Sequence, residues 1–247
     1  MAEPPVPPAT AVLVTGGSRG LGLAVVQDLL DRGTRVAAFA RTVSDSLRDL
    51  ANAHPGTLLA GAVDARDTVA TLAFLRAAEE ALGPLDGLVN NAGVAQDSVL
   101  AHTAPADIER VLSTNLLAPL LLTRAFLRQV LRRAGTARVV TIGSACAQAT
   151  YPGMVAYAAS KAGLEAATRA LSAETHGRVL VNCVAPGFFD SDMSSLYSER
   201  HRAAIARRTA TGTLMHPGHV VPMVRMLLLD DTGINGQILP VNGGGVR

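Results

Sequence analysis

The sequence predicts a single α/β domain whose parallel sheet is covered by helices on both faces. Short runs rich in Val, Ala and Leu alternate along the chain with longer segments of helical period, an order typical of a parallel sheet. The length of 247 residues suits one such domain, and no internal repeat is visible. The composition is 49% hydrophobic with 23 glycines and few aromatic residues. Small aliphatic side chains are therefore expected to build a closely packed core.

Seven apolar runs are predicted to form a doubly wound sheet, because continuous apolar strands are those buried on both faces. Their ranges are 10–17, 35–41, 56–64, 87–93, 137–144, 179–187 and 236–244. Helices are predicted between them. Their ranges are 21–33, a polar stretch ending near 53, 68–82, 104–133 and 155–175.

Two segments are expected to lie outside this regular pattern. The proline-rich residues 1–9 are predicted to form a flexible arm. Residues 188–215 are polar and rich in Arg and Ser, and are predicted to form a mobile flap over the substrate. Residues 10–247 together are expected to form one catalytic domain.

Composition and charge exclude several classes of function. A formal charge of +2 argues against nucleic acid or an anionic membrane as the main partner. The apolar runs are too short to span a bilayer, and the N-terminus lacks the features of a signal peptide. Two cysteines make no disulfide framework, so a cytoplasmic location is expected. No metal is predicted, because His102, His216 and His219 do not cluster with carboxylates at metal-ligand spacing.

The stretch TGGSRGLG, residues 15–22, follows one predicted strand and opens a helix. In this context Gly16 can turn sharply, Gly20 lets a pyrophosphate approach the backbone, and Gly22 allows the helix to pack closely on the strand. The helix N-terminus supplies free N–H groups for phosphates. A plain tight turn would also use glycine, but the placement favours a dinucleotide site and a Rossmann-type domain. The other residues of the turn expected to face the cofactor are Ser18, Arg19 and Leu21.

The end of the second strand favours NADP(H) over NAD(H). An acidic residue there would bind the ribose 2′-hydroxyl of NAD, but the strand closes with Ala40 and Arg41, and no acid follows until Asp45. Arg19 in the glycine turn can reach the same space, and two guanidiniums suit a phosphate. The alternative is two solvated arginines in an arginine-rich chain.

The stretch YAASK, residues 157–161, contains the only lysine of the chain. Tyr157 and Lys161 are four residues apart and share one face of a helix. A buried ammonium beside a phenol is expected to lower the pKa of Tyr157, and reaching about 7 would need roughly 4 kcal/mol. The tyrosine could then exchange a proton with a substrate oxygen. Such spacing is also common on ordinary helices.

Two further polar residues extend this candidate site. Ser144 ends the fifth strand, at the sheet edge where open α/β sheets bind ligands. Asn115 lies within a predicted helix, where asparagine is unfavourable. Taken singly, each has an ordinary structural explanation.

Taken together, the motifs resemble those of the short-chain dehydrogenase/reductase family. TGGSRGLG, NNAG (90–93), Asn115, Ser144, YAASK and APG (185–187) occur in the family's order and spacing, and the resemblance covers about residues 10–245. The stretches PGFFDSDM and GQILPVNGG are most similar to the 3-oxoacyl-(acyl-carrier-protein) reductases. Asn242, where such enzymes often carry an aspartate, and the irregular segment TATGTLMHPGHVV depart from that pattern.

The resemblance implies a role for each candidate catalytic residue. Tyr157 would donate a proton to the substrate carbonyl. Lys161 would hold the nicotinamide ribose and lower the tyrosine pKa. Ser144 would bind the carbonyl oxygen, and Asn115 would hold a water in a proton relay to Lys161.

The resemblance also implies cofactor contacts beyond the glycine turn. Asp64 would contact the adenine ring, and Asn90 with the residues beside it would line the cofactor. The full set of these further contacts is Asp64, Ala65, Asn91, Ala92, Gly93, Pro186 and Gly187.

The implied activity is NADPH-dependent reduction of a 3-oxoacyl thioester in fatty acid or polyketide assembly. Alternatives are a dehydrogenase of a free secondary alcohol or cyclic ketone, and a non-catalytic cofactor-binding scaffold. The stretch after Ser144 is expected to line the pocket, and Cys146 within it to pack. The other expected wall residues are Tyr151, Phe188, Phe189 and Met193.

Arg124, Arg128 and Arg132 are spaced to form a basic stripe on the long helix. Such a stripe could steer an acidic acyl carrier protein. It could equally be a solvated face or a subunit interface, the use that this helix often has in the family. A homotetramer is expected from the resemblance.

Overall fold

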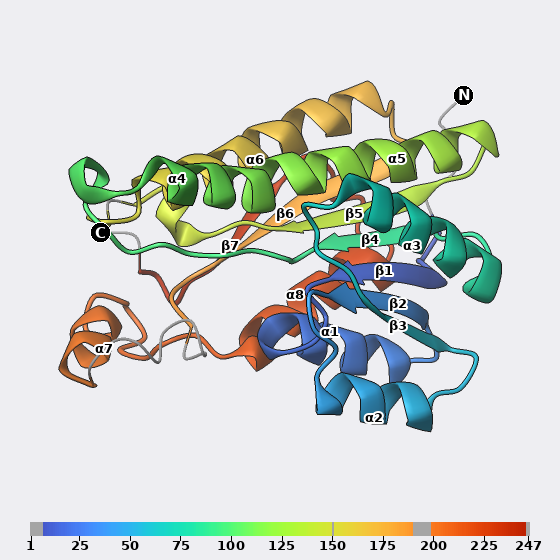
Figure 1. Ribbon diagram of the computed structural model, residues 1–247, viewed down its shortest axis with the longest axis horizontal. Helices are drawn as coiled ribbons and strands as arrows, with labels where there is room; N and C mark the ends of the chain where they lie inside the picture. Colours follow the sequence, from blue (N-terminus) through green and yellow to red (C-terminus); the bar gives the residue numbers. More distant parts are fainter. Residues whose placement is uncertain (1–6, 150, 190–198, 246–247) are drawn as a thin grey trace.

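The computed structural model of the chain describes residues 7–149, 151–189 and 199–245 (Figure 1). A seven-stranded sheet in the order β3-β2-β1-β4-β5-β6-β7 forms its centre, and every neighbouring pair is parallel. The strands are β1 (Ala11–Thr15), β2 (Arg35–Ala40), β3 (Leu58–Ala62), β4 (Gly87–Asn90), β5 (Ala137–Ile142), β6 (Val179–Pro186) and β7 (Ile238–Val241). The predicted fold class is confirmed, and the strand order reverses between β1 and β4, where such sheets bind ligands.

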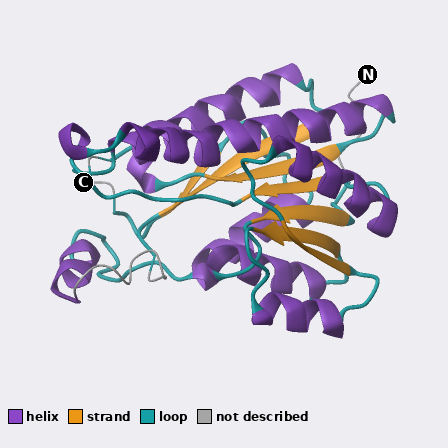
Figure 2. Ribbon diagram, viewed as in Figure 1, coloured by secondary structure: helices purple, strands orange, loops and turns teal. Residues whose placement is uncertain are grey.

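Helices form a layer on each face of the sheet (Figure 2). On one face α1 (Gly20–Leu30), α2 (Asp45–Ala53) and α8 (Pro217–Leu229) close a core that includes Leu29 and Val224. On the other, α3 (Thr68–Leu82), α5 (Ala118–Arg132) and α6 (Val155–Glu174) cover a core that includes Phe126 and Leu75. The shorter helices are η1 (Leu100–His102), α4 (Pro105–Leu112), η2 (Ser113–Leu117), η3 (Ala145–Ala147) and α7 (Glu199–Ala206).

The helix predicted over 104–133 is divided. Its two α-helical parts, α4 and α5, are joined by η2, a five-residue π-helical turn. A π-turn inside a helix often marks a functional site. The sequence pattern left the segment of α8 unassigned. The helix contains Pro222, and the stretch TATGTLMHPGHVV that leads into it is irregular.

The two segments predicted outside the regular pattern are partly described. At the end of the N-terminal arm, the Ala9 N–H donates to the Leu228 carbonyl at 2.9 Å, and the buried Arg138 guanidinium donates to the Pro7 carbonyl at 2.9 Å. Within the predicted flap, α7 stands apart from both helix layers (Figure 1), and residues 190–198 lie outside the described residues. In the part of the chain described, no helix is long and apolar enough to cross a membrane.

Candidate active site

The turn between β1 and α1 has the shape of a phosphate cradle. Gly16 and Gly20 have φ angles of +68° and +55°, which glycine adopts without strain. A Cβ on Gly22 would lie 2.2 Å from the Gly16 carbonyl oxygen, so no larger residue fits there. The N-cap residue of α1, Arg19, provides no side-chain cap for the first N–H groups of the helix. These amides and the helix dipole can therefore hold a pyrophosphate.

Thr15 and Asn91 fasten this cradle to the end of β4. The Asn91 amide nitrogen donates to the carbonyls of Thr15 and Gly16 at 2.9 and 3.1 Å. The Thr15 hydroxyl accepts the N–H groups of Asn91 and Ala92 at 3.0 and 2.9 Å. The Asn91 side chain thus holds the cradle in place, while its direct contact with a cofactor stays a prediction. Leu21, on the first turn of α1, packs against the core beneath.

Ser18 joins the cradle to the loop after β2. Its hydroxyl donates to the Thr42 carbonyl at 2.7 Å and accepts the Ser44 N–H at 2.8 Å, and the Ser44 hydroxyl returns a bond of 2.5 Å to the Ser18 carbonyl. The two loops that carry Arg19 and Arg41 are therefore held together, and both side chains are exposed.

Asp64 is engaged by an arginine of its own loop. Its carboxylate accepts from the Arg66 Nη2 at 2.8 Å, from Nε at 3.2 Å and from the backbone N–H at 2.9 Å. The bond from the Arg66 side chain, helped by the charge of Arg41, lowers the pKa of Asp64. Ala65 is partly buried against the core. The predicted adenine contact of Asp64 would have to be made beside this ion pair.

Asn115 lies in the π-turn η2 and is fully buried. Its Oδ1 accepts the Val94 N–H at 2.8 Å, and its Nδ2 donates to the Val94 carbonyl at 2.8 Å and to the Ser160 hydroxyl at 3.2 Å. Just past the end of β4, the Asn115 side chain thus bonds both backbone groups of Val94, as a neighbouring strand would. This role explains an asparagine at an unfavourable helical position. A Cβ on Gly93 would lie 3.4 Å from Asn115 Oδ1 and 3.6 Å from Lys161 Nζ. Gly93 therefore lies against both side chains, at distances where a Cβ would make ordinary contact.

Tyr157 and Lys161 lie on one face of α6, as predicted. The Lys161 Nζ is 5.7 Å from the centroid of the Tyr157 ring and donates to the Ile142 carbonyl, at the end of β5, at 2.8 Å. The Ser160 hydroxyl donates to the Tyr157 carbonyl at 2.6 Å. Because Ser160 also accepts from Asn115, the π-turn and the first turn of α6 form one connected unit.

Ser144 completes the group just past β5. It is buried, it caps η3, and its hydroxyl accepts the Cys146 N–H at 3.2 Å. Hydrogen bonding by this hydroxyl lowers the pKa of Tyr157, against the larger opposite effect of burial. Burial raises the pKa of the Cys146 thiol and keeps it uncharged, in keeping with its expected packing role.

The expectation that the pKa of Tyr157 is lowered is wrong. Burial, with a smaller contribution from Cys146, raises the pKa of Tyr157 to about 12. Burial likewise lowers the pKa of Lys161 to about 8. The ammonium points at the Ile142 carbonyl, so loss of hydration decides both values. Tyr157 therefore stays protonated at neutral pH, as a proton donor must.

The end of β6 faces the same edge of the sheet. The Gly187 N–H donates to the Val241 carbonyl at 2.9 Å, and a Cβ on Gly187 would lie 2.8 Å from the Asn242 Cα. Pro186 pairs with Val241 in the sheet. Asn242 accepts the Gly244 N–H at 3.0 Å through its side chain. The asparagine that departs from the family pattern thus shapes the turn behind Gly187.

The described part of the predicted flap approaches the loop after Ser144. The Arg208 guanidinium lies 5.4 Å from the centroid of the ring of Tyr151, which belongs to that loop. Within the flap itself, the Met215 N–H donates to the Phe188 carbonyl at 2.9 Å. Met193, predicted as a wall of the substrate pocket, lies outside the described residues.

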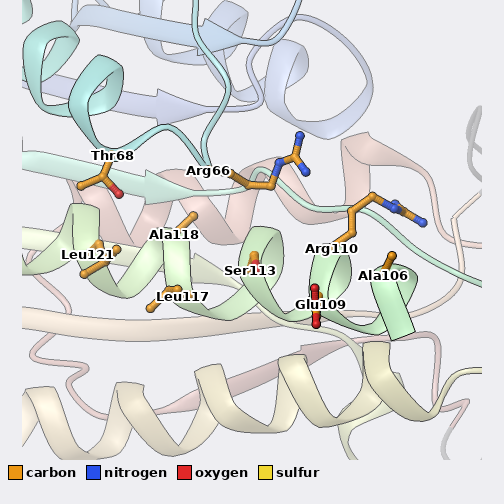
Figure 3. A pocket seen from close by; sticks show the side chains of 9 residues that line it. All are labelled: Arg66, Thr68, Ala106, Glu109, Arg110, Ser113, Leu117, Ala118 and Leu121. Atoms are coloured by element: carbon orange, nitrogen blue, oxygen red, sulfur yellow. The ribbon is translucent and has the colours of Figure 1, made fainter. Parts of the chain in front are cut away.

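A separate hollow of about 340 Å³ lies between the start of α3 and the run of α4, η2 and α5 (Figure 3). It contains none of the predicted catalytic or cofactor residues. Its lining is Arg66, Thr68, Ala106, Glu109, Arg110, Ser113, Leu117, Ala118 and Leu121. The hollow is therefore separate from the sheet edge where the four candidate catalytic residues lie. Among the described residues, no group of His, Cys, Asp and Glu has the arrangement of a metal site.

Sequence reasoning missed three hydroxyl residues that build the site: Thr15, Ser44 and Ser160. Each bonds to groups of another segment, as described above. Thr15 was visible as a polar residue at the end of an apolar strand, but neither of the serines differs in sequence from an ordinary loop or helix residue.

The fold and the site together have the form of a dinucleotide-dependent oxidoreductase. The family model described as short chain dehydrogenase matches residues 10–202. The 3-oxoacyl-(acyl-carrier-protein) reductase FabG of Salmonella typhimurium is 33% identical over 236 residues, 94% of this chain and 95% of that protein. FabG of Pseudomonas aeruginosa is 35% identical over 240 residues, with the same shares covered. A dehydrogenase/reductase of Sinorhizobium meliloti has a solved structure with a TM-score of 0.87 and 32% identity, covering 96% of this chain and 94% of that one.

The chain belongs to the short-chain dehydrogenase family. It is accordingly an oxidoreductase of the class that uses a nicotinamide cofactor. The predicted resemblance, including its likeness to the 3-oxoacyl reductases, is confirmed.

Proposed function

We propose that the protein reduces a ketone to a secondary alcohol with NADPH, and that the ketone is the 3-oxo group of an acyl thioester. The observation that carries this proposal is the grouping of Asn115, Ser144, Tyr157 and Lys161 at the carboxyl edge of the sheet. Ser160 links Asn115 to the Tyr157 backbone. The Ser144 hydroxyl acts on the pKa of Tyr157, and the Lys161 Nζ lies 5.7 Å from the centroid of the Tyr157 ring. The grouping lies beside a glycine cradle suited to a dinucleotide.

The cofactor would be held by the cradle and by the loops joined to it. Arg19 and Arg41 would bind the 2′-phosphate, and Asp64 and Ala65 would line the adenine. The nicotinamide, when bound, supplies the hydride. The residues proposed to line the rest of the cofactor are Gly16, Ser18, Gly20, Leu21, Gly22, Asn91, Ala92, Gly93, Tyr157, Lys161, Pro186 and Gly187.

The chain's own residues then stabilise the oxyanion and supply the proton. The Ser144 hydroxyl donates to the carbonyl oxygen as negative charge develops there. The Tyr157 phenol, which is protonated at neutral pH, gives its proton to the same oxygen. Lys161, whose pKa of about 8 lies near neutrality, can return a proton to Tyr157. Asn115 would hold the water that connects this relay to solvent.

The substrate class is supported by the named relatives, which are 3-oxoacyl-(acyl-carrier-protein) reductases. Arg124, Arg128 and Arg132 are all exposed on α5, which is compatible with docking of an acidic carrier protein. Fatty acid or polyketide assembly is the setting proposed for this reaction. Two free cysteines, Cys146 and Cys183, support a cytoplasmic location.

The same helix supports a proposal for assembly. Leu117 on η2 and Leu131 on α5 are 53% and 41% exposed, and the hollow of Figure 3 lies beside the first of them. Burial of such apolar side chains between subunits would remove them from water. We propose a homo-oligomer, a tetramer being favoured by the family resemblance.

A second candidate is oxidation or reduction of a free alcohol or ketone, because the structural relative is a dehydrogenase/reductase. A non-catalytic scaffold is the third, and its signature would be a lost catalytic residue. All four are present in this chain.

The first experiment follows NADPH absorbance with an acetoacetyl thioester, with NADH in parallel. Tyr157→Phe should lower turnover by about 10²- to 10⁴-fold while NADPH still binds. Binding of NADPH without turnover by the native chain would move the substrate to a free or cyclic ketone. Binding of neither cofactor would contradict the proposal.

A further inference from the structure

A carboxylate that the proposed mechanism does not use lies next to the candidate site. Glu165 follows Lys161 by one helical turn on α6 and is only 6% exposed. Its two carboxylate oxygens accept from the Gln148 amide at 3.1 and 3.3 Å. Within the described residues no cation pairs with it, and Gln148 is its one side-chain donor.

Such a group is costly for the fold alone. A buried carboxylate loses several kcal/mol of hydration unless it is paired and hydrogen-bonded. The rest of α6 is rich in alanine, and its buried positions include Leu164 next to Glu165. A leucine at 165 would contribute hydrophobic packing without that loss. The carboxylate is therefore better explained by what it holds than by stability.

Gln148 belongs to the turn that carries Ser144. The Ala147 N–H donates to the Ser144 carbonyl at 3.0 Å, and the Gln148 N–H donates to the Ala145 carbonyl at 3.0 Å. These bonds make residues 144–148 a compact unit that begins at the catalytic hydroxyl. Because Gln148 is exposed, its amide would otherwise turn freely into water. Its bond to Glu165 fastens the unit to the helix that carries Tyr157.

We propose that Glu165 is a positioning residue for the reduction: through Gln148 it holds the Ser144 turn on α6 and so sets the Ser144 hydroxyl against the Tyr157 phenol. The inference rests on the proposed function, since it assigns Ser144 and Tyr157 to one carbonyl oxygen. It involves no contact of Glu165 with substrate or cofactor.

The test removes the bond and then rebuilds it in reverse. Gln148→Leu removes the donor at a solvent-facing position, and the double variant Gln148→Glu with Glu165→Gln restores an amide–carboxylate pair with the partners exchanged. Glu174→Gln, an exposed carboxylate at the end of α6, is the matched control. For each, kcat, KM, the Kd for NADPH and amide hydrogen exchange over residues 144–149 are measured.

We expect Gln148→Leu to lower kcat about tenfold, because small displacements of reacting groups are costly. The Kd for NADPH should stay unchanged, exchange over 144–149 should rise, and the double variant should restore both kcat and exchange to near native values. Glu174→Gln should behave as native. A native kcat in Gln148→Leu, or a loss that the exchanged pair does not restore, would overturn the proposal.

Failure of the proposed function is distinguishable from failure of this inference. If the native chain turns over no ketone, the proposed function fails, but the exchange measurement still applies. Faster amide exchange over residues 144–149 in Gln148→Leu, reversed in the double variant, would then still show that the bond between Gln148 and Glu165 holds this turn on α6. Unchanged exchange would contradict it in either case.

Discussion

The proposed cofactor side and the proposed substrate side of the site are built in different ways. On the cofactor side, glycine backbone forms the cradle, and Thr15, Asn91 and Ser18 fasten it to the neighbouring strands through several bonds of 2.5–3.1 Å. On the proposed substrate side, loops meet through scattered contacts: the Arg208 guanidinium lies over the Tyr151 ring, and the Gln148 amide donates to Glu165. Single backbone bonds join Ser98 to Gly153 and Thr211 to Gly243.

This difference teaches where specificity can change. A cofactor held by backbone groups needs a rigid frame, and substitutions there disturb the fold itself. A substrate held by loops can be changed through single side chains that leave the sheet intact. Damage to the cofactor side should therefore appear as lost stability and binding, and damage to the substrate side as a change in KM or kcat.

The largest effect on the cofactor side is expected from Gly22→Ala. The added Cβ would lie 2.2 Å from the Gly16 carbonyl oxygen, and backbone would have to move. We expect a loss of about 3 kcal/mol or more in the free energy of unfolding, together with lost cofactor binding, measured by denaturant titration and fluorescence.

Gly20→Ala is the matched control for that change. Its φ of +55° strains alanine by about 1–2 kcal/mol, but nothing lies within 4 Å of the added Cβ. It should cost less than Gly22→Ala. Equal losses would mean that backbone strain, and not close contact, dominates this turn.

The second prediction concerns the pH dependence of stability. The pKa of Lys161 is lowered from 10.5 to about 8, so the unfolded chain binds more protons between these values. Native stability should therefore rise with pH from about 8, by up to about 3 kcal/mol near pH 10.5. In Lys161→Met this contribution is missing.

The test compares the free energy of unfolding of the native chain with that of Lys161→Met at each pH. Burial raises the pKa values of Cys183 and Tyr157 to about 12. Cys183 therefore lowers native stability as the pH rises above about 9, and Tyr157 does so above about 10. Urea titrations at pH 7, 8 and 9 should show the native chain gaining about 1 kcal/mol per pH unit over Lys161→Met above pH 8. Parallel curves would contradict the buried, weakly basic state of Lys161.

Most of the fold followed from the sequence because continuous apolar runs and a glycine turn leave few arrangements open. The α3 range was predicted to the residue, and each strand lies inside its predicted run. The π-turn at Asn115 could not be foreseen, since it depends on the backbone of Val94, which is distant in sequence. A local pattern carries no information on such a partner.

The candidate site shows the same limit. The spacing of Tyr157 and Lys161 correctly placed both on one helix face, but the direction of the tyrosine pKa shift is decided by burial of the phenol. Burial depends on how α6 packs against other segments, and a local spacing does not show that. Asn91 was expected at the cofactor, which stays a prediction; the bond from its amide nitrogen to the glycine turn was not foreseen.

A third prediction separates the two nicotinamide cofactors. Arg41→Ala should weaken NADPH binding about tenfold or more while leaving NADH nearly unchanged, because a charge-assisted bond to a phosphate contributes about 1.5–3 kcal/mol. Arg48→Ala is the control, since Arg48 is an exposed arginine nearby whose guanidinium already pairs with Asp45. Equal weakening of NADPH and NADH binding would contradict the proposal that Arg41 binds the 2′-phosphate.

The smallest effect is expected on the substrate side, from Arg208→Ala. The guanidinium lies 5.4 Å over the Tyr151 ring, and at an exposed site such a contact is worth about 0.5–1 kcal/mol. Its loss should loosen the approach of the predicted flap to the loop after Ser144. We expect KM for the ketone to rise about two- to fivefold, with kcat and the Kd for NADPH unchanged.

Arg207→Ala controls for the loss of a positive charge, because Arg207 is the exposed neighbour in sequence. If both variants raise KM equally, general attraction of an anionic substrate explains the effect and not the ring contact. A fall in cofactor binding in Arg208→Ala would break the comparison itself, because a substrate-side contact would then support the cofactor frame. A rise in KM confined to Arg208→Ala would strengthen the comparison, since one side chain would then change the KM for the ketone without contacting the sheet.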